Sequence, residues 1–232
     1  MKLIFPQATT AFNQLFTEMI ESSVGKDFLD KSFDSYSMEA VSKVILVVLE
    51  NTVVEDYLGK YLRASDLIED FEIIVLKKET SGSICSTLMA ISSLKGQAVI
   101  VSALDQIITG RKIDFCSMLN KDNADIIAPT YTSNDSSLCF TLKDDEGQVI
   151  QLFEKKPVSS EAILGVYLIR NFSYFYENSH ELLIKYKGFQ DRIFYTSDVI
   201  NHCIGKGDKI NFPHTDAKCY KIRSIGDVDY ML

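Results

Sequence analysis

A carboxylate at the end of an apolar run is the residue of this chain best placed to do chemistry. Asp105 follows the segment 98–104, which we expect to be a buried strand, and Gln106 comes directly after it. A carboxylate at the carboxyl end of a buried strand lies where open α/β sheets bind ligands. Mg²⁺ prefers such oxygen ligands and often bridges them to phosphates. Asp105 is therefore the first candidate metal ligand, although it could instead cap a turn or pair with a surface cation.

A polar turn containing glycine comes before this strand. Thr80, Gly82 and Ser83 stand at the start of a predicted helix over 83–94. Such a turn offers hydroxyls and backbone N–H groups to a ligand, whereas the alternative is a helix start capped by Ser81 or Ser83. Both interpretations can hold together.

A charged block and a glycine in the second half of the chain are further candidate contacts for a ligand. Glu154, Lys155 and Lys156 stand together before Pro157, and Gly165 lies in the predicted strand 163–169. Lys155 could contact a phosphate, but the block could also be a charged strand end. Gly165 could allow a ligand to approach the backbone closely, or it could mark a bulge.

Composition sets the class of protein. The chain has 232 residues, 46% of them apolar and 24% charged, which is typical of a globular protein with a substantial core. Its net charge of −8 argues against a general nucleic-acid binder. No apolar run is long enough to span a membrane and no secretory signal is recognisable, so we expect a cytoplasmic protein. The five cysteines lack any CxxC spacing and are expected to be free thiols.

Strands and helices alternate up to about residue 123, which predicts parallel strands joined by right-handed crossovers. Beyond that point short strands and turn signals dominate, and the sequence 144–147 is typical of a hairpin turn. Strands are predicted at 2–5, 44–49, 71–76, 98–104, 126–132, 138–143, 149–154, 163–169, 209–212 and 218–222. Helices are predicted at 11–20, 28–37, 54–62, 83–94, 114–119, 173–186 and 197–204, with a helical turn at 227–231. The expected fold class is α/β, with a mixed, mainly parallel central sheet, flanking helices and extra strands in the second half.

Several sequence blocks, in the same order, resemble the nucleotidyltransferases that join a nucleoside triphosphate to a sugar phosphate or choline-type phosphate. This family has a glycosyltransferase-A-like fold, and the resemblance covers roughly residues 44–227. The blocks that carry it are the turn and helix 80–88, the strand 99–106, the "D-x-G-x-V … E-K-x-P" pattern across 144–157 and the strand 163–167.

The resemblance implies a role for each candidate residue. Asp105 would bind Mg²⁺ and act in catalysis together with Lys155. Thr80, Gly82, Ser83 and Gln106 would bind the nucleotide, and Glu154, Lys155 and Gly165 the substrate. The chain 1–232 would form a single domain, with a nucleotide-binding half at 1–123 and a sugar or acceptor half at 124–232.

The sequence also departs from the family where charge matters most. The family has a Gly-rich loop with an arginine after the first strand, but residues 9–16 contain no glycine, arginine or lysine. The place of a second metal-binding aspartate falls near 221–223, where Lys221 and Arg223 are cations. Nucleotidyl transfer relies on positioning and charge stabilisation, so these losses weaken the case for catalysis.

Three functions stay open from the sequence. The first is a divergent nucleotidyltransferase, using Mg²⁺, that supplies precursors for surface polysaccharides. The second is a degenerate relative that binds a nucleotide or sugar phosphate, or a protein partner, without turnover. The third is a glycosyltransferase, which would prefer an Asp-x-Asp where this chain has Leu104-Asp105-Gln106. The expected partners are a nucleotide and a small phosphorylated substrate, with a homo-oligomer or protein partner also possible, and no nucleic acid.

Overall fold

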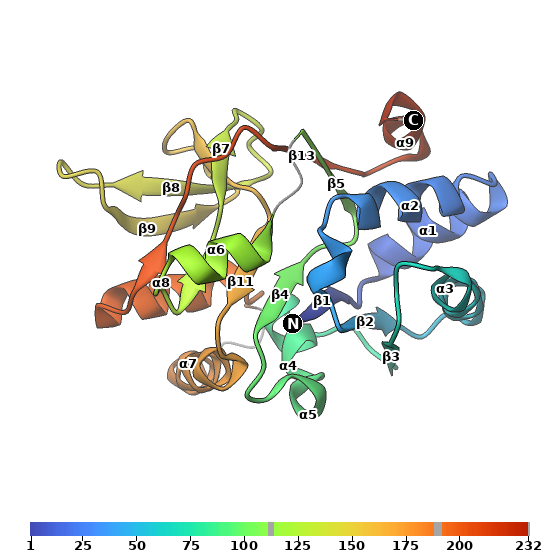
Figure 1. Cartoon of the computed structure of the whole chain (residues 1–232), viewed down its shortest axis with the longest axis horizontal. Coiled ribbons are helices and arrows are strands. Elements are labelled where there is room, and N and C mark those ends of the chain that lie inside the picture. Colours follow the sequence, from blue (N-terminus) through green and yellow to red (C-terminus); the bar gives the residue numbers. More distant parts are fainter. Residues whose placement is uncertain (111–113, 188–191, 232) are drawn as a thin grey trace.

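A seven-stranded sheet forms the centre of the molecule (Figure 1). The computed structural model describes residues 1–110, 114–187 and 192–231. In spatial order the strands are β12 (Ile210–Asn211), β6 (Ile126–Ile127), β11 (Val166–Ile169), β4 (Val99–Ser102), β1 (Lys2–Gln7), β2 (Lys43–Leu49) and β3 (Phe71–Leu76). Only β11 runs antiparallel to its neighbours, and the other pairings in this sheet are parallel. The predicted fold class is confirmed.

Helices cover both faces of this sheet. Alternation along β1 points Leu3 and Phe5 toward one hydrophobic core and Ile4 toward the other. The first face packs against α1 (Thr10–Glu21), α2 (Gly25–Asp34), α3 (Thr52–Ala64) and α6 (Phe115–Lys121). The second packs against α4 (Ser83–Leu88), α5 (Ile91–Leu94), α7 (Phe172–Lys185) and α8 (Thr196–Lys206). Because both faces are covered, the central strands read as continuous apolar runs.

The second half of the chain adds two smaller sheets and a terminal helix. The four-stranded sheet has the order β7 (Thr130–Thr132), β10 (Glu161–Ile163), β8 (Cys139–Lys143) and β9 (Val149–Glu154). The two-stranded sheet joins β5 (Gln106–Thr109) to β13 (Lys218–Lys221). The 3₁₀ turn η1 (Met38–Ala40) precedes β2, and α9 (Ile225–Met231) follows β13. The predicted hairpin is confirmed as β8 and β9, with Gly147 in the left-handed region at its turn.

Three predicted elements, at 83–94, 126–132 and 163–169, are divided in the structure, and a fourth, at 98–104, ends early. The strand predicted at 126–132 forms as β6 and β7, which belong to different sheets. The strand predicted at 98–104 ends at Ser102, and the chain bends before it enters β5, so Asp105 lies in that bend. The strand predicted at 163–169 breaks at Gly165, whose φ of +82° turns the chain from one sheet into another. The helix predicted at 83–94 forms as the two short helices α4 and α5.

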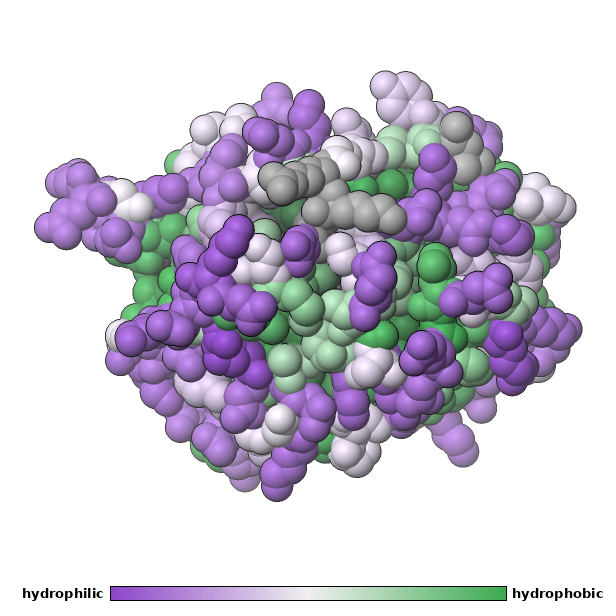
Figure 2. Space-filling view, viewed as in Figure 1, coloured by the Kyte–Doolittle hydropathy of each residue, from purple (hydrophilic) through white to green (hydrophobic). Residues whose placement is uncertain are grey.

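Hydrophilic side chains cover much of the face seen in Figure 2, and the hydrophobic patches between them are small. None of the described helices is long and apolar enough to cross a membrane. Both observations agree with the charge and hydropathy of the sequence.

Candidate functional site

A cavity of about 250 Å³ opens at the carboxyl ends of β1 and β4. The chain leaves β1 for β2 on one side, while β4 pairs with β1 on the other. The cavity therefore lies at a topological switch point of the sheet, where open α/β folds bind ligands. Its walls are Pro6, Gln7, Ser83, Val101, Ser102, Ala103, Ser137, Leu138, Cys139, Glu154, Lys155, Ile163, Gly165, Tyr167, Tyr195, Thr196 and Lys221.

Four of the eight candidate residues from the sequence meet on these walls. They are Ser83, Glu154, Lys155 and Gly165. They come from three stretches far apart in the chain, which the sheet topology brings together. The other four, Thr80, Gly82, Asp105 and Gln106, lie around the cavity but not on its walls. The functional roles assigned to these residues remain predictions.

Lys155 is held over the cavity by an unusual backbone conformation. Its φ of +54° lies in the left-handed region, which typically costs a residue with a Cβ about 1–2 kcal/mol. Its backbone N–H donates to the carbonyl of Leu138 at 2.9 Å. Its Nζ lies 5.3 Å from the ring centroid of Tyr195 and 3.3 Å from the Tyr195 hydroxyl. Strained residues cluster at binding sites, so this conformation favours a functional role.

Glu154 supplies the carboxylate on the cavity wall. The Ser197 hydroxyl, at the start of α8, donates to Glu154 Oε2 at 2.9 Å. Cys139 lies nearby, and burial together with the Glu154 carboxylate raises the pKa of its thiol. The cavity therefore holds a neutral thiol beside an oriented carboxylate.

Asp105 forms an ion pair with Lys221 at the edge of the cavity. Lys221 Nζ lies 3.2 Å from Asp105 Oδ1. The pair is fixed by the two-stranded sheet, in which Lys221 stands opposite Gln106. Burial lowers the pKa of Lys221, but Asp105, with smaller contributions from Cys219 and Glu154, raises it, so the pKa lies above its ordinary value overall. Lys221 is thus a permanent cation that reaches the cavity wall.

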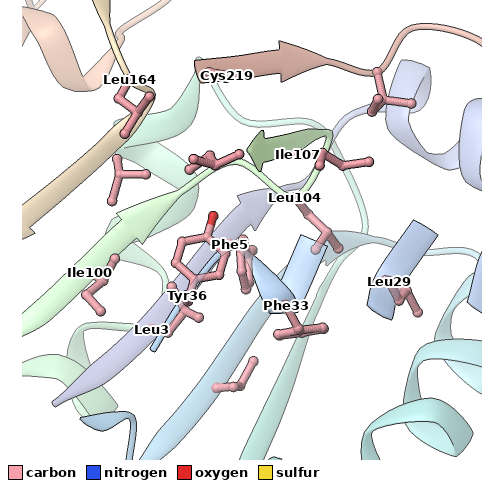
Figure 3. Packing of buried hydrophobic residues seen from close by; sticks show 14 of the residues in the cluster. Leu3, Phe5, Leu29, Phe33, Tyr36, Ile100, Leu104, Ile107, Leu164 and Cys219 are labelled. Carbon is pink, nitrogen blue, oxygen red and sulfur yellow. The ribbon is translucent and has the colours of Figure 1, made fainter. Parts of the chain in front are cut away.

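A hydrogen-bond network lies beneath the cavity. Gln106 is only 1% exposed, and its Nε2 donates to Ser102 Oγ at 2.8 Å and to the Gly165 carbonyl at 3.1 Å. The Tyr36 hydroxyl shares a 2.7 Å hydrogen bond with Ser102 Oγ. Figure 3 shows the Tyr36 ring beside Phe5, and the two ring centroids are 5.8 Å apart. Gln106 therefore orients the floor of the cavity from below.

Glycine is required at Gly165 because this network lies so close. Gly165 has a positive φ, and a Cβ there would stand 2.5 Å from Gln106 Oε1. The glycine thus leaves room for the Gln106 side chain and also forms part of the cavity wall.

The turn at Thr80 and Gly82 packs against the segment before α8. A Cβ on Gly82 would overlap the carbonyl oxygen of Phe194, and the Phe194 N–H donates to the Ser81 carbonyl at 2.7 Å. Thr80 Oγ1 donates to the Gly82 carbonyl at 3.0 Å. Internal packing therefore accounts for this glycine. Ser83 alone of the three predicted turn residues reaches the cavity.

Comparisons with known proteins agree with this architecture. No protein-family model and no curated protein sequence match the chain. Solved structures do match along almost the whole chain. The nucleoside-diphosphate-sugar pyrophosphorylase from Vibrio cholerae RC9 has a TM-score of 0.74 and 17% identity, covering 99% of each chain. The inositol-1-phosphate CTP transferase from T. maritima has a TM-score of 0.71 and 15% identity, covering 97% of this chain and 90% of the other.

A UDP-glucose pyrophosphorylase complexed with UDP-glucose has a TM-score of 0.70 and 17% identity, covering 98% of this chain and 95% of the other. The chain has the nucleotidyltransferase fold. The resemblance to nucleotidyltransferases predicted from the sequence is confirmed for the fold.

The N-terminal part of this nucleotidyltransferase fold has no phosphate loop. Only Ala8 and Thr9 separate β1 from α1. Thr9 caps the helix by accepting from the Phe12 N–H at 3.1 Å. The Glu79 carboxylate accepts from the Thr10 backbone N–H, and hydrogen bonds from Thr10 lower the pKa of Glu79. A carboxylate thus occupies the helix end that would attract a phosphate.

The residues around Asp105 do not fit Mg²⁺. Mg²⁺ is usually bound by one or two carboxylates together with waters and substrate phosphates, whereas the neighbour of Asp105 is the ammonium of Lys221, which would repel the ion. Within residues 1–110, 114–187 and 192–231, no three His, Cys, Asp or Glu side chains are grouped closely enough to hold a metal ion. Mg²⁺ is therefore assigned no part in the site.

Sequence reasoning missed part of the cavity wall. Tyr195, Thr196 and Ser137 were assigned no role, although all three line the cavity. Lys221 was recognised as a cation where the family has a metal ligand, but its pairing with Asp105 was not predicted. The only signal for that pairing was the presence of opposite charges in the two segments.

Proposed function

We propose that this protein binds a small phosphorylated molecule, of the size of a sugar phosphate, in the cavity between β1 and β4. The observation that carries the proposal is the permanent cation Lys221 on the cavity wall. Lys155 supplies a second ammonium, and Ser83 and Thr196 supply hydroxyls. Ammonium groups and hydroxyls are the usual protein ligands of a phosphate, so the chemistry of the wall suits an anion.

The size of the cavity supports a compact ligand. Pockets for drug-sized ligands span about 300–1,000 Å³, and this cavity is slightly smaller. A monosaccharide phosphate suits that volume better than a complete nucleotide-sugar. Glu154, fixed by Ser197, is placed to accept hydrogen bonds from sugar hydroxyls.

The start of the chain supports binding without nucleotidyl transfer. Transfer depends on donors that hold the triphosphate and stabilise developing charge. Here α1 replaces the loop, and Glu79 presents a negative charge at its first turn. Losing one such donor can reduce the rate by about 10²–10³. The absence of the loop therefore favours a binding role.

The fold supports a second candidate, an active enzyme. Solved structures with this fold include a nucleoside-diphosphate-sugar pyrophosphorylase and an inositol-1-phosphate CTP transferase. By analogy this chain would transfer a nucleoside monophosphate to a sugar phosphate, in the synthesis of surface polysaccharide precursors. The predicted two halves, 1–123 for the nucleotide and 124–232 for the acceptor, belong to this candidate.

Thermal-shift measurements separate the two candidates. The purified protein is tested with glucose 1-phosphate, inositol 1-phosphate, choline phosphate and the four nucleoside triphosphates, each in EDTA and in Mg²⁺. We expect one of the small phosphates to raise the melting temperature equally in EDTA and Mg²⁺. A rise that requires both Mg²⁺ and a triphosphate, followed by pyrophosphate release, would support the enzyme instead. A flat response to all probes would contradict both.

Lysine variants identify the site. Lys155→Met and Lys221→Met should each weaken binding of the active phosphate by about tenfold to a hundredfold, since each removes a charged hydrogen bond. Lys156→Met is the matched control, because Lys156 lies over the Phe153 ring and not on the cavity wall. Equal affinity in all three variants would place the ligand elsewhere.

A further inference from the structure

The bend at Asp105 holds a negative and a positive side chain at the position to which the family resemblance assigned a metal ion. We infer that the Lys221 ammonium permanently takes the place of a divalent cation beside Asp105, so that the cavity carries its own fixed positive charge. This inference concerns the charge at Asp105 and does not depend on which ligand the cavity binds.

Three sets of contacts hold the backbone around Asp105 and Lys221. β5 and β13 pair antiparallel through four residue pairs, ending with Gln106 opposite Lys221. The Ile222 N–H, next to Lys221, donates to the Asp105 carbonyl at 2.9 Å. From α2, the Ser32 hydroxyl lies 3.4 Å from the carbonyls of Leu104 and Gln106, on either side of Asp105. The ion pair is therefore built into the fold rather than formed by two mobile surface chains.

The local charges favour this arrangement over a metal ion. Lys221 faces Asp105 at 3.2 Å, and it also lies in the field of Glu154 and near the neutral thiol of Cys219. A divalent ion on Asp105 would be bound about 2.1 Å from the carboxylate, close to the ammonium, and would be repelled by it.

The ammonium leaves donors for a ligand. It has three N–H groups, of which one is directed at Asp105. Among the described residues no second acceptor lies within hydrogen-bond distance of Nζ. Because Lys221 lines the cavity, its remaining donors are available to an anion there. The anion would thus be held by a protein cation without help from a metal.

Mn²⁺ titrations followed by NMR test this inference. Mn²⁺ broadens the signals of amides near its binding site. In the wild-type protein we expect no selective broadening around Asp105 and Lys221. In Lys221→Asp and Lys221→Glu, which place a second carboxylate near Asp105, we expect selective broadening there and Mn²⁺ binding at least about tenfold tighter than in the wild type.

Lys218→Asp is the matched control. Lys218 lies on the same strand, β13, but is exposed on the opposite face from Lys221, so its variant should gain no Mn²⁺ site near Asp105. Broadening around Asp105 in the wild type would overturn the inference. Folded Lys221→Asp and Lys221→Glu proteins that bind Mn²⁺ no better than Lys218→Asp would overturn it too. If the Lys221 variants do not fold, the wild-type titration alone still shows whether Mn²⁺ binds beside Asp105.

A phosphate-binding measurement extends the test, and it is the only part of the test that rests on the proposed function. The small phosphate found by thermal shift should lose affinity for Lys221→Glu in EDTA and regain part of it with Mn²⁺. If no small phosphate binds the wild type, the proposed function fails, while the Mn²⁺ titrations still test the fixed charge at Asp105.

Discussion

Asp105 illustrates what a sequence can and cannot say about one residue. Its position after a buried strand predicted that it would lie at the carboxyl end of that strand, and it lies in the bend after β4, paired with a residue of the cavity wall. Its partner, Lys221, is 116 residues away and enters through β13, a strand whose pairing with β5 was not predicted. The chemistry of the site thus depends on a long-range contact that no local pattern of residues reveals.

The cysteines provide a test at the scale of single residues. Cys116 is exposed, whereas Cys139, Cys203 and Cys219 are buried. Burial raises the pKa of Cys203 and of Cys219 to about 11. In folded protein at about pH 8, we expect a thiol reagent such as DTNB to modify Cys116 rapidly and the three buried thiols only after unfolding. Rapid modification of Cys219 in the folded protein would contradict the burial described here.

The same pKa shift predicts how stability depends on pH. The pKa of Cys219 is higher in the folded state than its ordinary value of 9.0, so unfolding favours the thiolate at high pH. The resulting stabilisation is complete below about pH 9 and is lost as the pH rises through about 11. Between these values the free energy of unfolding should fall by on the order of 2 kcal/mol more in wild type than in Cys219→Ala. Cys116→Ala is the control and should follow the wild type, and parallel curves for all three proteins would contradict the prediction.

At the scale of elements, most of the core helices and strands were predictable because their apolar periodicity is strong. The predicted helix at 11–20 is α1, and the predicted strands at 44–49 and 71–76 are β2 and β3. Gly165 was recognised as a possible bulge, but not as the point where the chain passes from one sheet into another. The end of β4 at Ser102 was not predictable, because apolar residues continue through Leu104.

The turn before α4 gives a test at this scale. Gly82→Ala should lower the free energy of unfolding by about 2–4 kcal/mol, because φ is +109° and a Cβ would overlap the Phe194 carbonyl. Gly205→Ala is the control, since Gly205 lies in α8 with open space around its Cα and no positive φ. That variant should be as stable as wild type or gain up to about 1 kcal/mol in urea unfolding. Equal stability of the two variants would mean that the Gly82 turn does not pack on Phe194.

At the scale of the whole molecule, the two halves of the sequence share one sheet. β11, β6 and β12 from the second half extend the sheet of β4, β1, β2 and β3 from the first. The C-terminal segment then returns to the first half, where β13 pairs with β5 and the buried Val228 of α9 joins the same core as α1. The fold class could be predicted from alternating elements, but this interleaving could not, because strand order depends on contacts distant in sequence.

The shared sheet predicts a single cooperative unfolding transition. We propose that the chain is one domain, as the sequence predicted, because unfolding either half would expose the core of the other. Differential scanning calorimetry should give one transition with equal calorimetric and van't Hoff enthalpies. Two resolved transitions would indicate that the halves 1–123 and 124–232 unfold separately.

The central claim is that a protein cation, rather than a metal and a phosphate loop, holds an anion at the switch point of the sheet. The most direct test is an anomalous-diffraction map from crystals grown in EDTA and soaked in tungstate, a heavy mimic of phosphate. We predict a tungsten peak in the cavity, within hydrogen-bond distance of the Lys221 and Lys155 ammonium groups. A peak at the start of α1 instead, or a cavity with no peak beside Lys221, would contradict the claim.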